Sequence, residues 1–335
     1  MHKDDFIKMD HSVSVIVPLF NEEKYIKNLI LSINQQDYPH ELLEVVFVDG
    51  NSTDNTVQLI HENIKSDIQY KIINNTLKKT PISVNLGIKN STGEVIVRLD
   101  GHSEYDCRYI RLCVQYLFKT NADNVGCLVE AQSEGMIATC IAEVLSSKFG
   151  VGNSRFRVNS ESGYVDTVPF GCFKRDLFDR IGYFNEELLR SEDNEFNSRI
   201  IKNGGKIYLF NDIKTVYHSR DSIKSFLKMG YLNGYEIIST GINYPGSIGL
   251  RHIIPLLFVV SILASLVLIQ FNFIKILFSL EMLLYFLLDL YFTVSTTIKS
   301  PYKVGALFKV VLYPAFHISY GIGSLCGLLG YIFKR

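Results

Sequence analysis

The sequence lacks an excess of charge of either sign, since lysine plus arginine and aspartate plus glutamate both number 34. Proteins that bind nucleic acid usually carry a basic excess, so we expect no nucleic-acid partner. The first residues, MHKDDFIKMDHS, also lack the apolar core of a signal peptide. We therefore expect the folded part of the chain to remain on the side of the membrane where it is made.

Cysteine is sparse, and no two of the six cysteines form a Cys-x-x-Cys pair. This spacing fits neither a zinc site nor a dense disulfide framework, so we expect reduced thiols facing the cytosol. The cysteines are Cys107, Cys113, Cys127, Cys140, Cys172 and Cys326.

A Gly-x-Gly-x-x-Gly turn is absent after the first apolar run, where the chain reads PLFNEE at residues 18–23. That turn is the signature of a dinucleotide-binding sheet. Its absence argues against an NAD-dependent oxidoreductase on a similar fold.

Short apolar runs alternate with amphipathic stretches over the first two thirds of the chain. We expect strands at Val13–Val17, Glu44–Val48, Ile68–Ile73 and Glu94–Leu99, and helices at Glu22–Gln35 and Thr56–Ile64. Such alternation predicts an open α/β sheet flanked by helices, in which ligands bind beyond the carboxyl ends of the strands. Those ends are Pro18–Glu22, Asp49–Ser52 and Asp100–His102.

The composition changes after Arg251. Ile253–Phe271 carries no charge and is long enough for a membrane helix, which needs about 20 apolar residues. Phe273–Val294 contains three charged residues but is otherwise apolar. We expect a second span there, because charged side chains at membrane depth face protein rather than lipid.

A third apolar segment, Val310–Phe333, leaves its placement open. Three lysines before it favour a cytosolic loop, and a full span would then place Lys334 and Arg335 outside, against the positive-inside bias. The segment either spans the membrane, lies in the interface or re-enters. The sequence thus predicts a cytosolic domain (1–221), an amphipathic connector at the membrane surface (222–250) and a membrane region with two or three helices (251–335).

Polar residues at the first two strand ends suit a nucleotide. VSVIVPLFNEEKYI (13–26) leads from a strand through Pro18, Phe20 and Glu22 into a helix, and VVFVDGNSTDNT (45–56) ends a strand at Asp49. A carboxylate at a strand end can accept hydrogen bonds from a base or a ribose. Taken alone, an ordinary strand–turn–helix junction with helix capping explains each motif equally well.

The third strand end, EVIVRLDGHSEYD (94–106), places Asp100 and His102 two residues apart. Carboxylate oxygen and imidazole nitrogen suit Mn²⁺, whereas Mg²⁺ prefers oxygen ligands. A divalent metal there would neutralise the charge of a leaving diphosphate. Asp-x-His pairs also occur by chance.

In their order and spacing, "VSVIVPLFNEEKYI", "VDGNSTDNT" and "STGEVIVRLDGH" resemble the family 2 glycosyltransferases, which have a GT-A fold. The resemblance covers residues 12–243, and the tail is similar to that of succinoglycan-type (ExoA-like) membrane glycosyltransferases, which build bacterial exopolysaccharide. It implies an open mixed sheet flanked by helices and followed by C-terminal transmembrane helices. It also implies a multi-pass protein of the inner (plasma) membrane with a cytoplasmic catalytic domain.

The resemblance implies a set of nucleotide-sugar-binding residues: Pro18, Phe20, Glu22, Asp49, Lys79 and Asp100. Asp100 and His102 stand at the family's Asp-x-Asp metal motif, with histidine in place of the second aspartate. The implied cofactor is a divalent metal, Mn²⁺ before Mg²⁺.

Within Val168–Tyr208 the chain resembles the acceptor side of the family. The wall of the acceptor site is implied at Gly171, Phe173–Arg175 and Phe184. Glu192 and Asp193 match the family's Glu-Asp pair before a helix, and Asp193 foremost would take the proton from the acceptor hydroxyl. We expect the helix dipole to lower its pKa. A plain helix-capping pair is the alternative.

His218, in VYHSRDSIKSF (216–226), could supply a third metal ligand, and Arg220 could pair with phosphate. A plain surface or core histidine explains His218 as well. Processive synthases of the family carry a Gln-x-x-Arg-Trp motif shortly afterwards. This chain has KMGYLNGYE (228–236) and no tryptophan, which favours addition of a single sugar.

The motifs and the resemblance therefore predict an inverting, metal-dependent hexosyltransferase that moves one sugar from an NDP-sugar to a polyprenyl-diphosphate-linked saccharide. The expected nucleotide of the donor is UDP. We also expect the chain to contact membrane lipid. Its pathway would be exopolysaccharide, capsule or O-antigen synthesis. One alternative is transfer to polyprenyl phosphate itself. Another is a non-catalytic membrane partner, against which the intact Asp100, His102 and Asp193 speak.

Overall fold

The computed structural model describes residues 10–158, 160–219 and 221–333 and divides into two compact units. The first unit comprises Met1–Val129 and Asn159–Tyr217, and the second comprises Glu130–Val158 and His218–Arg335. Residues 130–158 therefore belong with the C-terminal helices, whereas the sequence suggested one continuous domain up to residue 221. The physical reason is that the apolar helices of this stretch pack against the last helix of the chain.

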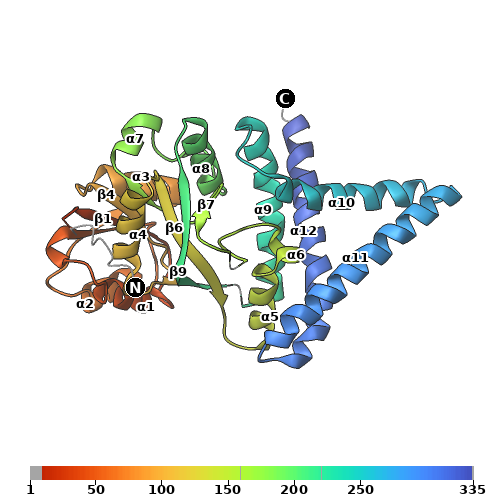
Figure 1. The fold of residues 1–335 in the computed structure, drawn as a ribbon, viewed down its shortest axis with the longest axis horizontal. Coiled ribbons are helices and arrows are strands. Elements are labelled where there is room, and N and C mark those ends of the chain that lie inside the picture. Colours follow the sequence, from red (N-terminus) through yellow and green to blue (C-terminus); the bar gives the residue numbers. More distant parts are fainter. Residues whose placement is uncertain (1–9, 159, 220, 334–335) are drawn as a thin grey trace. The chain divides into compact units, whose positions relative to one another are not determined.

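The first unit is built on a mixed sheet (Figure 1). Among the described residues the strands follow the order β3-β2-β1-β4-β8-β6-β9-β5, with β7 paired to β9. The pairs β1–β2, β1–β4 and β2–β3 are parallel, and β4–β8, β6–β8, β5–β9 and β7–β9 are antiparallel. The strands are β1 (Val13–Leu19), β2 (Leu43–Asp49), β3 (Gln69–Asn74), β4 (Val95–Arg98), β5 (Ser103–Glu104), β6 (Asn124–Gln132), β7 (Gly163–Tyr164), β8 (Cys172–Lys174) and β9 (Ile207–His218).

The four strands expected from apolar runs are confirmed as β1 to β4. β1 and β4 are buried along nearly their whole length, as continuous apolar runs in a parallel sheet require. The parallel arrangement brings the carboxyl ends of β1, β2 and β4 to the same edge of the sheet. This edge carries the candidate site.

Helices cover the sheet, and α3 packs against β1 and β2. A side chain at Gly87 of α3 would clash with Ile16, so glycine allows this helix to approach the strand closely. The helices of the first unit are α1 (Ile26–Asn34), α2 (Thr56–Asn63), α3 (Thr80–Lys89), α4 (Tyr109–Lys119), α7 (Asp176–Ile181) and α8 (Glu192–Lys202), with a 3₁₀ turn at His40–Leu42. The predicted helices at Glu22–Gln35 and Thr56–Ile64 correspond to α1 and α2.

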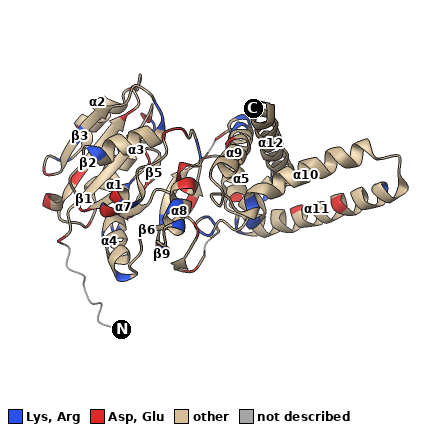
Figure 2. Ribbon diagram, turned by 90° about the horizontal axis from the view of Figure 1, so that it is seen from above, with Lys and Arg blue, Asp and Glu red and all other residues tan. Residues whose placement is uncertain are grey.

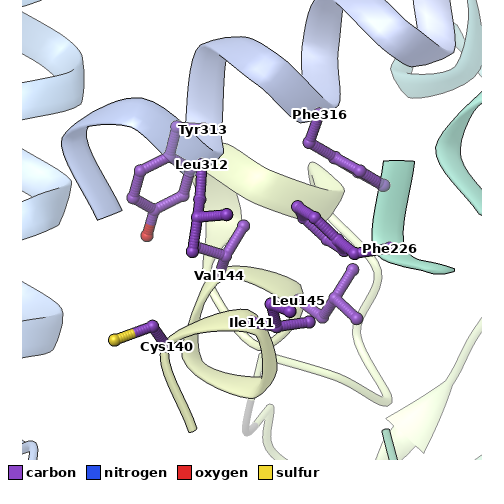
Figure 3. Packing of buried hydrophobic residues seen from close by; sticks show 8 residues of the cluster. All are labelled: Cys140, Ile141, Val144, Leu145, Phe226, Leu312, Tyr313 and Phe316. Carbon is purple, nitrogen blue, oxygen red and sulfur yellow. The ribbon is translucent and has the colours of Figure 1, made fainter. Parts of the chain in front are cut away.

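The second unit is helical, and its core forms where α5, α9 and α12 meet (Figure 3). Phe226 stacks on Phe316 with ring centroids 4.7 Å apart, and the fully buried Lys309 pairs with Glu143 of α5 at 2.6 Å. The helices are α5 (Met136–Leu145), α6 (Lys148–Val151), α9 (Ile223–Asn243), α10 (Leu250–Val267), α11 (Asn272–Lys299) and α12 (Ala306–Phe333), with a 3₁₀ turn at Lys303–Gly305.

The predicted connector contains a long helix, α9, which packs along α12 through glycines. A side chain at Gly234 would clash with the carbonyl of Tyr320, and one at Gly323 would clash with the carbonyl of Tyr231. Backbones this close are typical of the small-residue contacts between membrane helices. The connector thus serves as a packing partner of the last helix.

In the part of the chain that the structure describes, two helical segments are long and apolar enough to cross a membrane by length and composition, Leu250–Val267 and Lys303–Phe333. Only 11% of the first and 28% of the second is buried, so neither resembles the core helix of a soluble protein. α11 forms the helix expected at Phe273–Val294 and carries Lys275, Glu281 and Asp289, and it is not one of these two segments. Figure 2 shows how few charged residues lie along α10 and α12. The terminal Lys334 and Arg335 lie outside the described residues.

Candidate active site

The loops after β1 and β2 are held together by hydrogen bonds between backbone and side chains. The amide of Asn21 donates to Ser52 Oγ at 2.9 Å, and the amide of Glu22 donates to Thr56 Oγ1 at 2.8 Å. In return, the amide of Thr53 donates to Asn21 Oδ1 at 2.8 Å. Residues 21–23 are therefore held at this junction, and α1 begins after it, at Ile26 rather than at Glu22.

Asp49 ends β2 as a buried carboxylate that accepts hydrogen bonds from the amide and the hydroxyl of Ser52, at 3.0 and 2.6 Å. The amide of Gly50 donates to the carbonyl of Leu19 at 2.7 Å. A side chain at Gly50 would sit 3.0 Å from that same carbonyl, so the close approach of the two loops favours glycine.

β4 delivers Asp100 and His102 to the same edge. The amide of Asp100 donates to the buried Tyr105 hydroxyl at 2.9 Å, which fixes the backbone at this turn. His102 Nδ1 lies 3.0 Å from Glu22 Oε1, and the imidazole contacts Tyr217 edge-on at 5.0 Å. Glu22 therefore orients the imidazole from the neighbouring loop.

A cavity of about 130 Å³ opens at this edge of the sheet. Five residues that the sequence assigned to the donor or metal site line it: Pro18, Phe20, Glu22, Asp100 and His102. The rest of the lining is Leu19, Gly50, Lys78, Thr80, Ser83 and Gly101. The strand-end rule thus located the cavity correctly.

Asp49 and Lys79 do not line this cavity. The ammonium of Lys79 donates to the carbonyl of Glu186 at 3.2 Å, and the lysine at the cavity is its neighbour. Lys78 has a left-handed backbone, with φ of 56°, and its ammonium lies 4.7 Å from the centre of the Phe20 ring. At the turn into α3 it is therefore Lys78 that lines the cavity, and the role of Lys79 in nucleotide binding stays a prediction.

Arg98, the last residue of β4, joins Asp100 to Glu192 and Asp193. Its Nε lies 3.2 Å from Asp100, its Nη1 lies 2.8 Å from Asp193, and its Nη2 lies 3.3 Å from Glu192. Burial alone lowers the pKa of Arg98, but the three carboxylates raise it above its usual range, so the guanidinium stays charged. Sequence reasoning missed this residue, because a single arginine within a strand gives no signal of its partners.

Asp193 lies in the first turn of α8, and its pKa is raised to about 7. Burial is the main cause, the Arg98 charge opposes it, and the Glu192 and Asp100 charges add to it. From the helix dipole we expected a lowered pKa at Asp193, whereas its pKa is raised, because burial and the neighbouring carboxylates outweigh the Arg98 charge. Near neutral pH this carboxyl can both accept and release a proton.

Backbone strain gathers around the same residues. Left-handed φ values occur at Asn21, Asn51, Lys78, Phe170 and Ser191, all in turns next to the residues described above. Phe170 is bulky and Ser191 directly precedes Glu192, so these conformations cost energy of order 1–3 kcal/mol each. Strain of this kind is typical of functional sites.

Within the described ranges, no three His, Cys, Asp or Glu side chains are grouped to hold a metal ion. Asp100 and His102 nevertheless both line the cavity, and the Glu22 carboxylate lies against the imidazole of His102. Metal-ligating histidines commonly donate their second ring N–H to such a carboxylate. The donor set therefore fits a divalent cation whose remaining ligands come from a diphosphate or from water.

His218 ends β9 and belongs to the second unit, whereas Asp100 and His102 belong to the first. Its role as a third metal ligand stays a prediction. Arg220 lies outside the described residues.

Comparison with known proteins gives three relevant matches. Residues 14–143 match the family model Glycosyl transferase family 2. The dolichyl N-acetyl-alpha-D-glucosaminyl phosphate 3-beta-D-2,3-diacetamido-2,3-dideoxy-beta-D-glucuronosyltransferase of Methanococcus voltae is 31% identical over 224 residues, which are 64% of this chain and 70% of that protein. The succinoglycan biosynthesis protein ExoA of Rhizobium meliloti is 22% identical over 244 residues, 72% of this chain and 74% of that protein.

Among solved structures, the mannosyltransferase PcManGT from Pyrobaculum calidifontis, in complex with GDP-Man and Mn²⁺, has a TM-score of 0.62 at 18% identity. The match covers 94% of this chain and 87% of that chain, and it shows a shared fold. The resemblance seen in the sequence motifs, including that to ExoA, is thereby confirmed. On its sequence and its GT-A-like mixed sheet, the chain belongs to glycosyltransferase family 2.

Proposed function

We propose that the protein is an inverting glycosyltransferase that moves one sugar from a UDP-sugar to a lipid-linked saccharide during synthesis of an exopolysaccharide, capsule or O-antigen. One observation carries this proposal. A cavity at the ends of β1 and β4 is joined through Arg98 to a carboxylate, Asp193, whose pKa is raised to about 7.

The donor would bind with its nucleotide between Phe20 and the turn at Asp49, and with its diphosphate near Asp100. Lys78 lines the cavity and would contact the diphosphate, and Lys79, next to it in the chain, would lie near the nucleotide. Pro18 shapes the wall beside them.

Asp100 and His102 would hold a divalent cation, Mn²⁺ before Mg²⁺, with His218 as a further ligand. When bound, the cation neutralises charge on the departing diphosphate. Glu22 would keep the imidazole of His102 in the orientation that ligation requires. The Mn²⁺ in the related mannosyltransferase structure supports this choice of metal.

The chemistry is a single displacement. The acceptor hydroxyl oxygen attacks the anomeric carbon, the bond from that carbon to the diphosphate oxygen breaks, and the nucleoside diphosphate leaves with the bonding electrons. Asp193 takes the hydroxyl proton, assisted by Glu192 as its neighbour in the Arg98 cluster. Attack from the face opposite the leaving group inverts the anomeric configuration.

The acceptor would be a polyprenyl-diphosphate-linked saccharide. The membrane-length segments Leu250–Val267 and Lys303–Phe333 would anchor the enzyme in the plasma membrane as a multi-pass protein with its catalytic unit in the cytoplasm. The name of the Methanococcus voltae relative, which specifies a dolichyl-linked sugar phosphate, supports a lipid-linked acceptor.

A donor screen tests the proposal. Full-length protein in detergent with Mn²⁺ is incubated with a panel of UDP- and GDP-sugars and a polyprenyl-diphosphate-linked N-acetylhexosamine, and nucleotide release and product mass are measured. We expect one UDP-sugar to stabilise the protein thermally and to be consumed, and Asp100→Ala to abolish both effects. Turnover with GDP-sugars alone would refute the uridine assignment, and absence of any turnover would refute the transferase.

Transfer to polyprenyl phosphate is the second candidate, favoured by the same membrane-length helices. It predicts a glycosyl phospholipid formed without a saccharide primer. A parallel reaction with polyprenyl phosphate alone distinguishes the two acceptors by product mass.

A further inference from the structure

Arg98 lies between the donor side and the acceptor side of the site. We propose that it is a positioning residue for sugar transfer. Its guanidinium fixes the position of Asp193 relative to Asp100, so that the base, Asp193, faces a donor bound at the cavity. This inference rests on the proposed function, because it assigns Asp193 the role of base.

The geometry uses each nitrogen of the guanidinium for a different carboxylate. Nε bonds to Asp100, Nη1 to Asp193 and Nη2 to Glu192, at 3.2, 2.8 and 3.3 Å. The backbone of Arg98 is fixed as well, because its amide donates to the carbonyl of Gly171 at 3.0 Å. Because the guanidinium is planar and rigid and the backbone of Arg98 is fixed, the guanidinium sets the distances between the three carboxylates.

The electrostatics make the arrangement depend on this one cation. Arg98 is 3% exposed, so solvent screens the three carboxylates poorly and they would repel one another without it. Among the described residues, Arg98 is the cation that pairs with Asp100, with Glu192 and with Asp193. A lysine would keep the charge but could not bridge three acceptors through a planar fork.

Asp100 lines the cavity, and Asp193 is not among the residues that line it. Because Arg98 bonds to both carboxylates, it fixes the position of Asp193, which lies outside the cavity lining, relative to Asp100, which lines the cavity. A displaced base should slow the chemical step while the donor still binds, because a misplacement of about 1 Å can cost on the order of 100-fold in rate.

The test compares Arg98→Lys, Asp193→Asn and the double variant in the full-length protein. The matched control is Arg111→Lys: Arg111, on α4, also donates through its Nε to an aspartate, Asp37, at 2.9 Å, and it has no assigned role in the site. The measurements are kcat and KM for the donor found in the screen, the Kd of UDP with Mn²⁺ by calorimetry, and the thermal midpoint.

We expect Arg98→Lys to lower kcat about 100-fold with unchanged affinity for UDP and Mn²⁺, whereas Arg111→Lys leaves kcat unchanged. Because the two residues act as a unit, the double variant should be no slower than Asp193→Asn alone. If Arg98 only supported the fold, Arg98→Lys would lower the donor affinity and the thermal midpoint together. The rate losses of the two single variants would then multiply in the double variant.

Two results would overturn the inference alone in an active enzyme: a wild-type kcat for Arg98→Lys, or rate losses that multiply in the double variant. A wild-type chain that transfers no sugar from any donor would overturn the proposed function and this inference together. The two failures are therefore distinguishable.

Discussion

Asp193 shows how one side chain acquires a chemical role from its neighbours. A carboxyl in water would be ionised at neutral pH and would be a poor proton acceptor. Burial and the nearby Glu192 and Asp100 charges raise its pKa to about 7, while Arg98 limits the rise. The proton affinity is thus matched to a reaction that runs near neutrality.

The pH dependence of the rate follows from that value. Because only the ionised form of Asp193 can take the acceptor proton, kcat should fall about tenfold for each pH unit below about 7 and level off above it. The measurement is kcat at saturating donor from about pH 5 to about pH 9. Asp193→Asn serves as the control. Its kcat should be about 100- to 10,000-fold lower and should not fall further as the pH is lowered. A wild-type rate that stays constant down to about pH 5 would rule out this group as the base.

The sequence predicted part of the lining of the cavity, and there is a clear physical cause for what it did not predict. Phe20, Glu22, Asp100 and His102 were found because each directly follows an apolar run, and strand ends meet at one edge. Arg98 was missed because its partner Glu192 is 94 positions away, so only the chain topology brings them together. Lys78 was missed in favour of Lys79 because a left-handed turn decides which side chain faces the cavity.

At the scale of elements, burial alone does not explain which strands were predicted, because β3 was predicted although none of its residues is buried, and β6 was not predicted although its first six residues are buried. β1, β2 and β4 carry continuous apolar runs, whereas β5, β7 and β8 have only two or three residues, too few for any periodicity. The antiparallel part of the sheet therefore could not be anticipated in detail. Among the helices, α9 was expected to belong to an amphipathic connector at the membrane surface, because its sequence alone does not identify α12 as its packing partner.

Glycine contacts between α9 and α12 give a stability prediction. Gly323→Ala places a methyl group against the carbonyl of Tyr231, and helix separation should cost about 1–3 kcal/mol. The matched control is Gly330→Ala on the same helix, where the new methyl group would lie 3.4 Å from the Tyr235 hydroxyl. That change should be neutral or stabilising by up to about 1 kcal/mol, because alanine favours helix. Thermal unfolding of the detergent-solubilised protein measures both, and equal midpoints would contradict the packing described.

At the scale of the whole molecule, the apolar surface defines how the chain meets a membrane. Many of the large apolar side chains of α10 and α11 are exposed, which in water would be an aggregation hazard and in lipid is the normal state. The two helices contact each other within their unit, with Phe258 stacked on Tyr285 at 4.6 Å. Arg251 precedes the pair and Lys299 and Lys303 follow it, so the positive-inside bias would place both ends in the cytoplasm.

A membrane-crossing hairpin of α10 and α11 has a direct test by cysteine accessibility. In a Cys107→Ser, Cys326→Ser background, Asn272→Cys at the turn should react with an impermeant maleimide added to intact cells. Lys303→Cys should react only after permeabilisation. If Asn272→Cys also needed permeabilisation, the pair would lie in or dip into the cytoplasmic interface instead of crossing.

The division of the chain into units was the least predictable feature. Composition predicts a change near residue 251, but residues 130–158 are compositionally ordinary and still pack with the C-terminal helices. Their contacts, such as Glu143 with Lys309, join positions 166 residues apart. No local pattern reports a pairing at that distance.

The interleaved order of the two units limits how the enzyme can be shortened for soluble expression. A gene product that stops at the end of β9 would still contain α5 and α6 but would lose the helices that cover Ile141, Val144 and Leu145. Those side chains would then face solvent and favour aggregation. A soluble catalytic fragment would therefore need polar substitutions on this face of α5. Alternatively, the whole segment from 130 to 158 could be replaced by a short loop.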